Sequence, residues 1–288
     1  MRNPAEQTNI GPMTIVAADQ YEPDPLVRDP LAVRLLPAAY RPVAAATRWG
    51  PVRRMIERMS EKRIPGLWAS MLCRKRFIDD ALAADAERGL DAVVVLGAGF
   101  DTRAYRLPGL EKTRVYEVDL PGTMARKRAA VARAYGRVPA HVTLVPLDFE
   151  TQSLPDALAA RGYDPAGRTF FVWEAVTQYL TEDAVRATFG FLAGAARGSR
   201  LAFTYVRRDF LDGTEMYGAR LAYRDFVEKR PLWRFGLLPD DVPGLLGAYG
   251  WRRLDDAGPA EFAERYVKPA GRGLPVSEIE RSVLAEKV

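Results

Sequence analysis

The chain has 288 residues, of which 48% are hydrophobic and 27% charged, the composition of an ordinary globular protein. No uninterrupted apolar run approaches the roughly 20 residues that a membrane-spanning helix requires, so we expect no membrane partner. The formal net charge of +5 comes from basic residues spread along the chain beside acids, which argues against a nucleic-acid partner. A single cysteine, Cys73, excludes an internal disulfide, and the first residues lack the apolar core of a signal peptide. We therefore expect a cytoplasmic protein.

The first part of the chain, up to about residue 88, has a helical pattern that prolines interrupt repeatedly. Its apolar residues form short faces, such as Leu35 with Leu36 and Ile56 with Met59. Such faces are buried against another element in a globular protein. We predict an N-terminal helical segment at 1–88 that packs on a core domain at 89–288.

Strands and helices alternate from about residue 90 onward, which predicts an α/β fold with a doubly wound, mostly parallel sheet. The predicted strands are 92–96, 114–118, 142–147, 169–174 and 200–206. The predicted helices between them lie near 102–106, 121–136, 153–161 and 181–196. In sheets of this kind, ligands bind at the carboxyl ends of the strands.

The pattern changes after Val206. Residues 207–230 are rich in charged and aromatic side chains and predict one long helix. We expect this helix to belong to a cover, at about 207–240, that lies over the ligand site. A helix at 239–249 and strands near 251–255 and at 279–286 complete the predicted elements.

The stretch from Val93 to Leu96 has the length and the β-branching of a buried parallel strand. It leads into Gly97-Ala98-Gly99, where missing side chains allow a sharp turn and the close approach of a ligand. Asp101 then provides a cap for a helix. A strand, a glycine turn and a helix in this order are typical of a nucleotide-binding sheet.

The next predicted strand ends in an acid, Asp119, about 20 residues after Gly99, which is the spacing of a carboxylate that binds a ribose hydroxyl. The third glycine of the dinucleotide motif is missing, since Thr102 and Ala104 stand where it would fall. That glycine opens a helix start to a pyrophosphate. Its absence favours a nucleoside ligand without pyrophosphate, such as S-adenosylmethionine, over NAD.

Four stretches of the sequence resemble the leucine carboxyl methyltransferase family, namely LGAGFDTRAYRL at 96–107, YEVDLP at 116–121, WEAVTQYLTEDAV at 173–185 and SRLAFTYV at 199–206. The tail at 271–283 resembles the bacterial branch, which includes polyketide carboxyl methyltransferases. The resemblance implies a class I methyltransferase fold with a reversed last strand. It also implies S-adenosylmethionine as methyl donor and S-adenosylhomocysteine as product.

The resemblance assigns roles to individual residues. Arg74 matches the arginine that binds the methionine carboxylate, and Asp148 with Phe149 matches the pair that recognises adenine. Glu174 matches the acid beside the cofactor at the end of the fourth strand. The residues expected to bind the cofactor are Arg74, Gly97, Ala98, Gly99, Asp119, Leu120, Asp148, Phe149 and Glu174.

Residues near the transferable methyl group follow from strand ends and loops. Tyr179 and Tyr205 are the expected catalytic residues, because a hydroxyl there could hold an acceptor carboxylate. The expected acceptor-binding residues are Tyr21, Tyr179, Tyr205, Arg207 and Tyr217. His141, the only histidine, precedes the third strand and is expected to be a bystander rather than a base, and Cys and His are too few for a metal site.

The leading hypothesis is an O-methyltransferase that esterifies a carboxylate of a small, anionic, polyketide-like or aromatic metabolite. A carboxylate is ionised at neutral pH and needs no general base, whereas a phenol would gain from one. Methylation of a phenolic or other hydroxyl is the first alternative. A module that binds S-adenosylmethionine without transfer, a methyltransferase for a protein C-terminus and an NAD-dependent dehydrogenase are the others. The sequence does not predict the oligomeric state.

Overall fold

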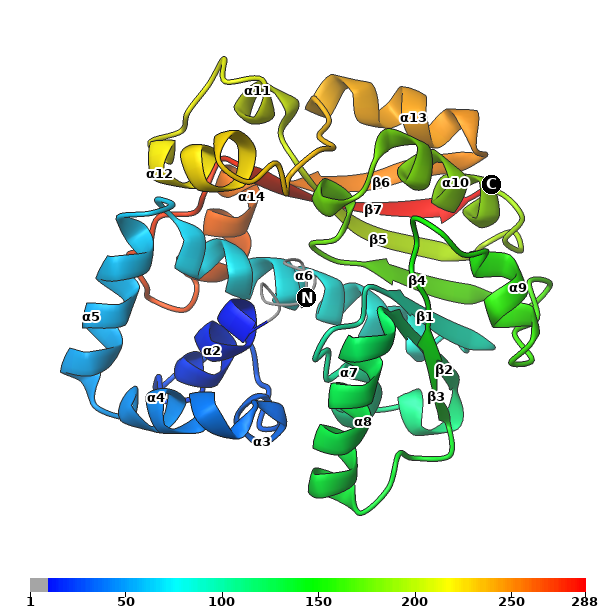
Figure 1. Ribbon diagram of the computed structural model, residues 1–288, viewed down its shortest axis with the longest axis horizontal. Helices are drawn as coiled ribbons and strands as arrows, with labels where there is room; N and C mark the ends of the chain where they lie inside the picture. Colours follow the sequence, from blue (N-terminus) through cyan, green and yellow to red (C-terminus); the bar gives the residue numbers. More distant parts are fainter. Residues whose placement is uncertain (1–9) are drawn as a thin grey trace.

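A seven-stranded sheet forms the centre of the molecule in the computed structural model, which describes residues 10–288 (Figure 1). The first nine residues, which belong to the predicted N-terminal segment, lie outside the described part. The strand order is β3-β2-β1-β4-β5-β7-β6. The strands are β1 (Ala92–Leu96), β2 (Arg114–Asp119), β3 (Val142–Pro146), β4 (Thr169–Trp173), β5 (Arg200–Val206), β6 (Trp251–Ala257) and β7 (Glu280–Lys287).

Strands β1 to β5 run parallel, and β7 alone is antiparallel to both of its neighbours, β5 and β6. The predicted class I methyltransferase topology, with its reversed last strand, is therefore confirmed. Because β7 is reversed, its first residue, Glu280, pairs with Val206, the last residue of β5. The start of β7 thus lies at the same edge of the sheet as the carboxyl ends of the parallel strands.

Each strand divides its side chains between two apolar cores, because successive residues point to opposite faces. Val93 and Val95 belong to one core, together with residues of the N-terminal helices and α8. Val94 and Leu96 belong to the other core, with residues of α9, α10 and α13. The β1 strand is buried on both sides, which explains its uninterrupted apolar sequence.

Helices cover both faces of the sheet, with α6, α7 and α8 on one side and α9, α10 and α13 on the other (Figure 1). The helices between and after the strands are α7 (Arg103–Arg106), η2 (Leu110–Lys112), α8 (Pro121–Tyr135), α9 (Leu154–Ala159), η3 (Thr177–Tyr179), α10 (Glu182–Leu192), η5 (Pro239–Asp241), α13 (Val242–Ala248), α14 (Pro259–Phe262) and η6 (Ala263–Val267). The predicted helices at 102–106, 121–136, 153–161 and 181–196 all have counterparts here, two of them shorter.

The N-terminal segment is helical and lies against the core through α6, its longest helix. Its elements are α2 (Ile10–Asp19), α3 (Ala32–Leu35), η1 (Ala38–Tyr40), α4 (Arg41–Ala46), α5 (Gly50–Glu61) and α6 (Leu67–Ala86). Leu72 and Ile78 of α6 are fully buried in the same core as Val93 and Val95 of β1. This shared core accounts for the apolar faces of the segment; the division of the chain at residue 88 stays a prediction.

The cover is not one long helix, so the prediction for 207–230 is wrong. The segment contains three short helices, α11 (Arg208–Leu211), α12 (Arg220–Tyr223) and η4 (Arg224–Glu228). Between α11 and α12 the backbone takes positive φ angles at Gly213 (75°), Tyr217 (46°) and Gly218 (72°), which no right-handed helix accommodates. Periodic charged and aromatic residues suggested a helix, but the two glycines break it.

The glycine turn after β1 depends on Gly97. Its φ is 71°, and the amides of Gly97 and Ala98 both donate to the carbonyl of Val118, at 2.8 and 2.9 Å. A Cβ atom on Gly97 would lie 2.1 Å from Cγ2 of Val176, in the loop after β4. Only glycine therefore allows β1 and the β4 loop to approach this closely.

We expect Gly97→Ala to lower the free energy of unfolding by about 2 to 5 kcal/mol, as the sum of an unfavourable φ and an overlap with Val176. Gly198→Ala is the matched control, since Gly198 has a φ of 80° and no atom within 4 Å of the position that a Cβ would take. It should cost only about 1 to 2 kcal/mol. Urea unfolding measures both; equal losses would mean that the contact with Val176 adds nothing.

Candidate active site

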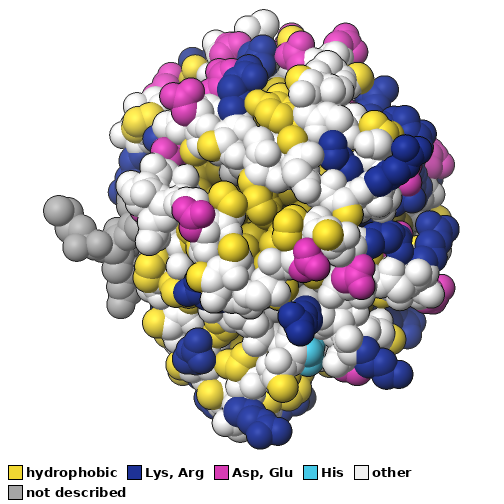
Figure 2. Space-filling view, turned by 90° about the vertical axis from the view of Figure 1, so that its right-hand side faces the viewer, with side chains coloured by type: hydrophobic (Ala, Val, Ile, Leu, Met, Phe, Trp, Pro, Cys, Tyr) yellow, Lys and Arg dark blue, Asp and Glu magenta, His cyan; other side chains and the backbone are white. Residues whose placement is uncertain are grey.

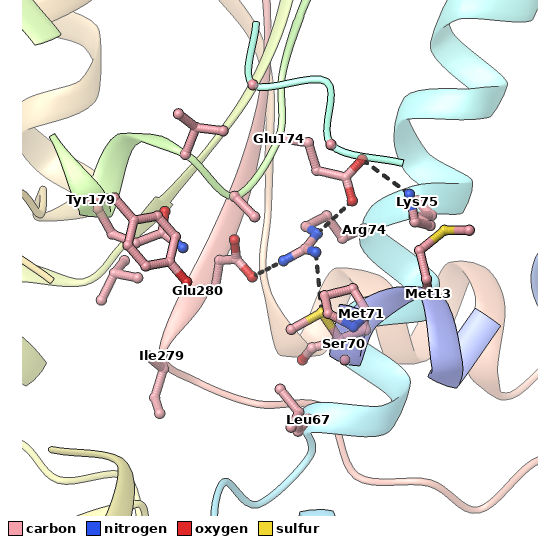
Figure 3. A pocket seen from close by; sticks show the side chains of 18 of the residues that line it. Met13, Leu67, Ser70, Met71, Arg74, Lys75, Glu174, Tyr179, Ile279 and Glu280 are labelled. Atoms are coloured by element: carbon pink, nitrogen blue, oxygen red, sulfur yellow. Dashed lines mark hydrogen bonds and ion pairs between the residues drawn. The ribbon is translucent and has the colours of Figure 1, made fainter. Parts of the chain in front are cut away.

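A cavity of about 380 Å³ lies at the carboxyl edge of the sheet, where β1, β4 and β5 end and β7 begins. The cover contributes Phe226 and Trp233 to its wall, and α2 contributes Met13. Helix α6 contributes one of its faces, since Leu67, Ser70, Met71, Arg74 and Lys75 follow the spacing of three and four residues that aligns side chains on a helix (Figure 3).

A cluster of buried charges forms the floor of the cavity around Glu174, directly after β4. Its Oε1 accepts from Arg74 Nε at 2.9 Å, and its Oε2 accepts from Arg103 Nη1 at 2.8 Å and lies 3.6 Å from Lys75 Nζ (Figure 3). Arg103 also binds Asp101 and, at 2.6 Å, Asp79. Three elements that are distant in the sequence therefore meet at one carboxylate.

This cluster keeps its carboxylates ionised. Burial alone would raise the pKa of Glu174, but the charges of Lys75, Arg103 and Arg74 outweigh it and hold the pKa well below its ordinary value. The pKa of Asp101 is likewise lowered, since Arg103 and Lys75 overcome the effect of burial. Neither carboxylate can take up a proton near neutral pH.

Glu280 is a functional candidate that the sequence did not suggest. Its Oε2 accepts from Arg74 Nη1 at 2.5 Å, and its Oε1 accepts from Thr204 Oγ1 at 2.8 Å. In Figure 3 it lies between Arg74 and Tyr179. The reversal of β7 was predicted, and with it the first residue of that strand could have been placed at the ligand edge.

Arg74 thus holds two carboxylates and still presents one nitrogen to a weak partner. Its Nη2 donates only to Met71 Sδ, at 3.1 Å, among the described residues. A thioether sulfur is a poor acceptor, so an anionic oxygen could take its place. Arg74 itself is 3% exposed and lines the cavity.

The glycine turn forms the opposite wall, through Gly97, Ala98 and Gly99. Asp119, at the end of β2, accepts from the amides of Gly99 and Leu120, both at 2.7 Å. Burial raises the pKa of Asp119, while these two amides act to lower it. Asp119 and Leu120 do not line the cavity; they lie next to it and fix the shape of the turn.

Asp148 and Phe149 follow β3, on the far side of β2 from the glycine turn. The Asp148 Oδ1 accepts from the amide of Glu150 at 3.0 Å, and both residues are partly exposed outside the cavity. The ends of β1, β2 and β3 are adjacent along one edge. The predicted cofactor-binding residues therefore form a continuous row, although only part of it lines the cavity.

Tyr179 lies at the end of η3 and lines the cavity (Figure 3), as predicted for a residue near the acceptor. Tyr205 does not, and its predicted position is corrected. Its neighbours in β5, Thr204 and Val206, face the glutamate and the cavity, so the strand period turns Tyr205 to the other face. There it is fully buried and its hydroxyl donates to Asp256 at 3.3 Å.

The other three predicted acceptor-binding residues also lie outside the cavity. Tyr21 follows α2, whose opposite end carries Met13 at the cavity, and a ten-residue helix separates its two ends by about 15 Å. Arg207 and Tyr217 contact each other, with the guanidinium 5.0 Å from the ring centroid, and both bind Asp209. Burial and the bond to Asp209 raise the pKa of Tyr217 to about 12.

His141 contacts the carbonyl of Ala104 at 2.9 Å through Nε2 and does not line the cavity. Within residues 10–288, no group of three or more His, Cys, Asp and Glu side chains is arranged to hold a metal ion. The same residues include no helix long and apolar enough to cross a membrane. Basic side chains are interspersed with acidic ones on the face shown in Figure 2 and form no continuous basic surface there.

Comparison with solved structures defines the class of protein. A crystal structure of a methyltransferase from Thermobifida fusca superimposes with a TM-score of 0.57 and 16% identity, covering 99% of this chain and 97% of the other. A DUF574 family protein from Streptomyces avermitilis gives a TM-score of 0.57 at 15% identity, covering 96% and 97%. The fold and the glycine-turn site are those of a class I methyltransferase.

Sequence comparison defines the family. The leucine carboxyl methyltransferase family matches residues 9–193, so the chain belongs to that family. A relative from Streptomyces avermitilis, described as an S-adenosyl-L-methionine-dependent methyltransferase, is 30% identical over 91% of this chain and 88% of its own length. One from Streptomyces coelicolor with the same description is 31% identical over 85% and 82%. The chain is an S-adenosylmethionine-dependent methyltransferase.

We expect Glu174→Gln to lower the free energy of unfolding at pH 7 by about 3 to 5 kcal/mol, because it leaves three buried cations without their common partner. In the wild type the pKa of Glu174 is depressed by folding, so its stabilisation is complete above the unfolded pKa and declines as the pH falls. The difference between the two proteins should therefore be constant above about pH 5.5 and shrink below about pH 4.5.

Urea unfolding at several pH values measures this difference. Glu182→Gln is the control, since Glu182 pairs with Arg186 at the surface and is 61% exposed. It should change stability by less than about 1 kcal/mol at any pH. A loss for Glu174→Gln that matches the control, or that grows on acidification, would contradict the charge cluster described above.

Proposed function

We propose that this enzyme transfers the methyl group of S-adenosylmethionine to a carboxylate oxygen of a small molecule and forms a methyl ester. The observation that carries the proposal is the absence of a free base among the described residues that line the cavity. Its three carboxylates are Asp101, Glu174 and Glu280, and each is bound to an arginine. A carboxylate acceptor needs no base, because it arrives ionised.

The cavity residues fit the methyl donor. We propose that Arg74 Nη2 binds the methionine carboxylate in place of Met71 Sδ, and that Asp119 binds the ribose, Gly97 to Gly99 giving the backbone room for it. Asp148 and Phe149 would then lie at the adenine end of the row. S-adenosylmethionine supplies an electrophilic methyl group on a positively charged sulfur.

The protein's part in the reaction is alignment and the exclusion of water. We propose that Tyr179, beside Glu280, orients the acceptor carboxylate opposite the methyl–sulfur bond. An oxygen lone pair then forms the new C–O bond, and the C–S bonding pair remains on sulfur. The volume of about 380 Å³ is typical of a small-molecule site, which supports a small acceptor over a protein C-terminus.

One observation favours transfer to a hydroxyl as a second candidate. Glu280 is a carboxylate at the acceptor end whose side chain is 15% exposed, and its hydrogen bond to Thr204 involves a neutral group. If its contact with Arg74 were exchanged for the cofactor carboxylate, Glu280 could accept a proton from a phenol. The product distinguishes the two candidates.

The first test of the proposal is the affinity for the methyl donor. Arg74→Lys removes Nη2, so the dissociation constant of S-adenosylmethionine should rise roughly 10- to 100-fold, as for a lost charged hydrogen bond. Arg76→Lys, on the same helix, is the control, because Arg76 pairs with Asp80 at the surface and does not line the cavity. Calorimetric affinities that are equal for both variants would exclude Arg74 as the carboxylate ligand.

The second test is the chemical class of the product. The enzyme is incubated with methyl-labelled S-adenosylmethionine and a panel of aromatic and aliphatic acids and phenols, and the products are treated with mild alkali. We expect label to be released as methanol, because alkali hydrolyses a methyl ester. Label that survives alkali would identify an ether and would favour Glu280 as a base.

A further inference from the structure

The acceptor end of the cavity is mostly apolar. Ile64, Leu67, Val206 and Ile279 line it, with the aromatic pair of the cover above them. A wall of this kind holds the body of a hydrophobic molecule but gives it no fixed orientation. Orientation must come from the few polar atoms that face the cavity.

Two buried polar atoms in this wall have no hydrogen-bond partner. They are Oε1 of Gln178 and Nε1 of Trp233, and both residues line the cavity. Gln178 is 4% exposed, so water does not solvate its amide freely. Buried polar groups in folded proteins almost always have partners, so a pair of unpartnered groups in one cavity points to a ligand.

The two groups belong to one rigid wall. The amide of Arg234, next to Trp233, donates to the carbonyl of Gln178 at 2.6 Å. The Arg234 guanidinium donates to the carbonyl of Tyr179 at 2.6 Å and to Glu150 at 3.1 Å. The Trp233 ring stacks on Phe226 with centroids 4.7 Å apart and planes at 11°. Both polar atoms are thus fixed before a ligand binds.

Other tryptophans show why position matters. Trp173 and Trp251 also have an unpartnered indole nitrogen, but both are 2% exposed or less and belong to the apolar core on the opposite side of the sheet from α6. Trp251 packs there against Phe171, and neither indole lines the cavity. Only Trp233 combines an unpartnered indole with a place in the wall, among the described residues.

We propose that Gln178 and Trp233 form a subsite for a hydroxyl group on the body of the acceptor, so that the substrate is a hydroxylated apolar acid and not a plain hydrocarbon acid. A hydroxyl can donate to the Gln178 oxygen and accept from the Trp233 N–H at the same time. The inference rests on the proposed function in one respect, since Tyr179, the neighbour of Gln178, is taken to lie at the reacting carboxylate.

The test uses binding to the complex with S-adenosylhomocysteine. The probes are benzoate and its 2-, 3- and 4-hydroxy derivatives, and toluene with phenol as a pair that lacks the carboxylate. At least one hydroxylated probe should bind about tenfold or more tightly than its parent, as two hydrogen bonds allow. Gln178→Met, which keeps the length of the side chain, should reduce that ratio to about threefold or less.

Nitrogen-15 labelling of the five tryptophans supplies a readout that does not depend on turnover. The hydroxylated probe should move the Trp233 indole signal, which Trp233→Phe identifies, and its parent should not. The Trp251 indole signal is the internal control and should stay in place. If Trp233→Phe does not fold, Gln178→Met and the binding ratios decide.

The outcomes separate this inference from the proposed function. Equal binding of every hydroxylated probe and its parent, or a ratio that Gln178→Met leaves unchanged, would overturn the subsite even if methyl esters are formed. Failure to bind S-adenosylhomocysteine would instead contradict the cofactor site. A hydroxyl preference shown by phenol over toluene supports the subsite whichever oxygen is methylated.

Discussion

The carboxylate of Glu174 is the interaction on which the rest of the site depends. A buried charge is tolerated only when it is paired, and Glu174 is paired with cations from α6 and from the helix after the glycine turn. These elements must therefore meet at the end of β4, or several charges would be buried alone. Arg103 carries the constraint further, to Asp101 and Asp79, so the glycine turn is anchored to the same cluster.

The direction of β7 gives the site its second anchor. An antiparallel strand begins where its parallel neighbours end, so Glu280 lies beside Val206 and reaches both Arg74 and Thr204. A seventh strand parallel to β5 would place its first residue at the opposite edge of the sheet. The reversed topology thus contributes a charged residue that separates the cofactor end of the cavity from the acceptor end.

The sequence was sufficient for the sheet and for the cofactor end, because both rest on local signals. Uninterrupted apolar runs mark buried strands, and Gly97 with Gly99 marks the turn at which a ligand approaches. The acceptor end could not be derived in the same way. Whether Tyr205 faces the cavity depends on the strand period, and whether 207–230 forms a helix depends on Gly213 and Gly218.

The two ends of the cavity are also built on different principles, and this bears on how the enzyme selects its acceptor. The cofactor end uses paired charges that no single substitution can alter without leaving a buried ion, so it tolerates little change. The acceptor wall consists of short cover elements joined to the loop after β4 through Arg234, whose contacts are mainly with backbone carbonyls. Side chains such as Gln178 and Trp233 can therefore be exchanged without disturbing the charge cluster. An enzyme built in this way keeps one methyl donor and changes its acceptor by substitutions in the cover and the β4 loop.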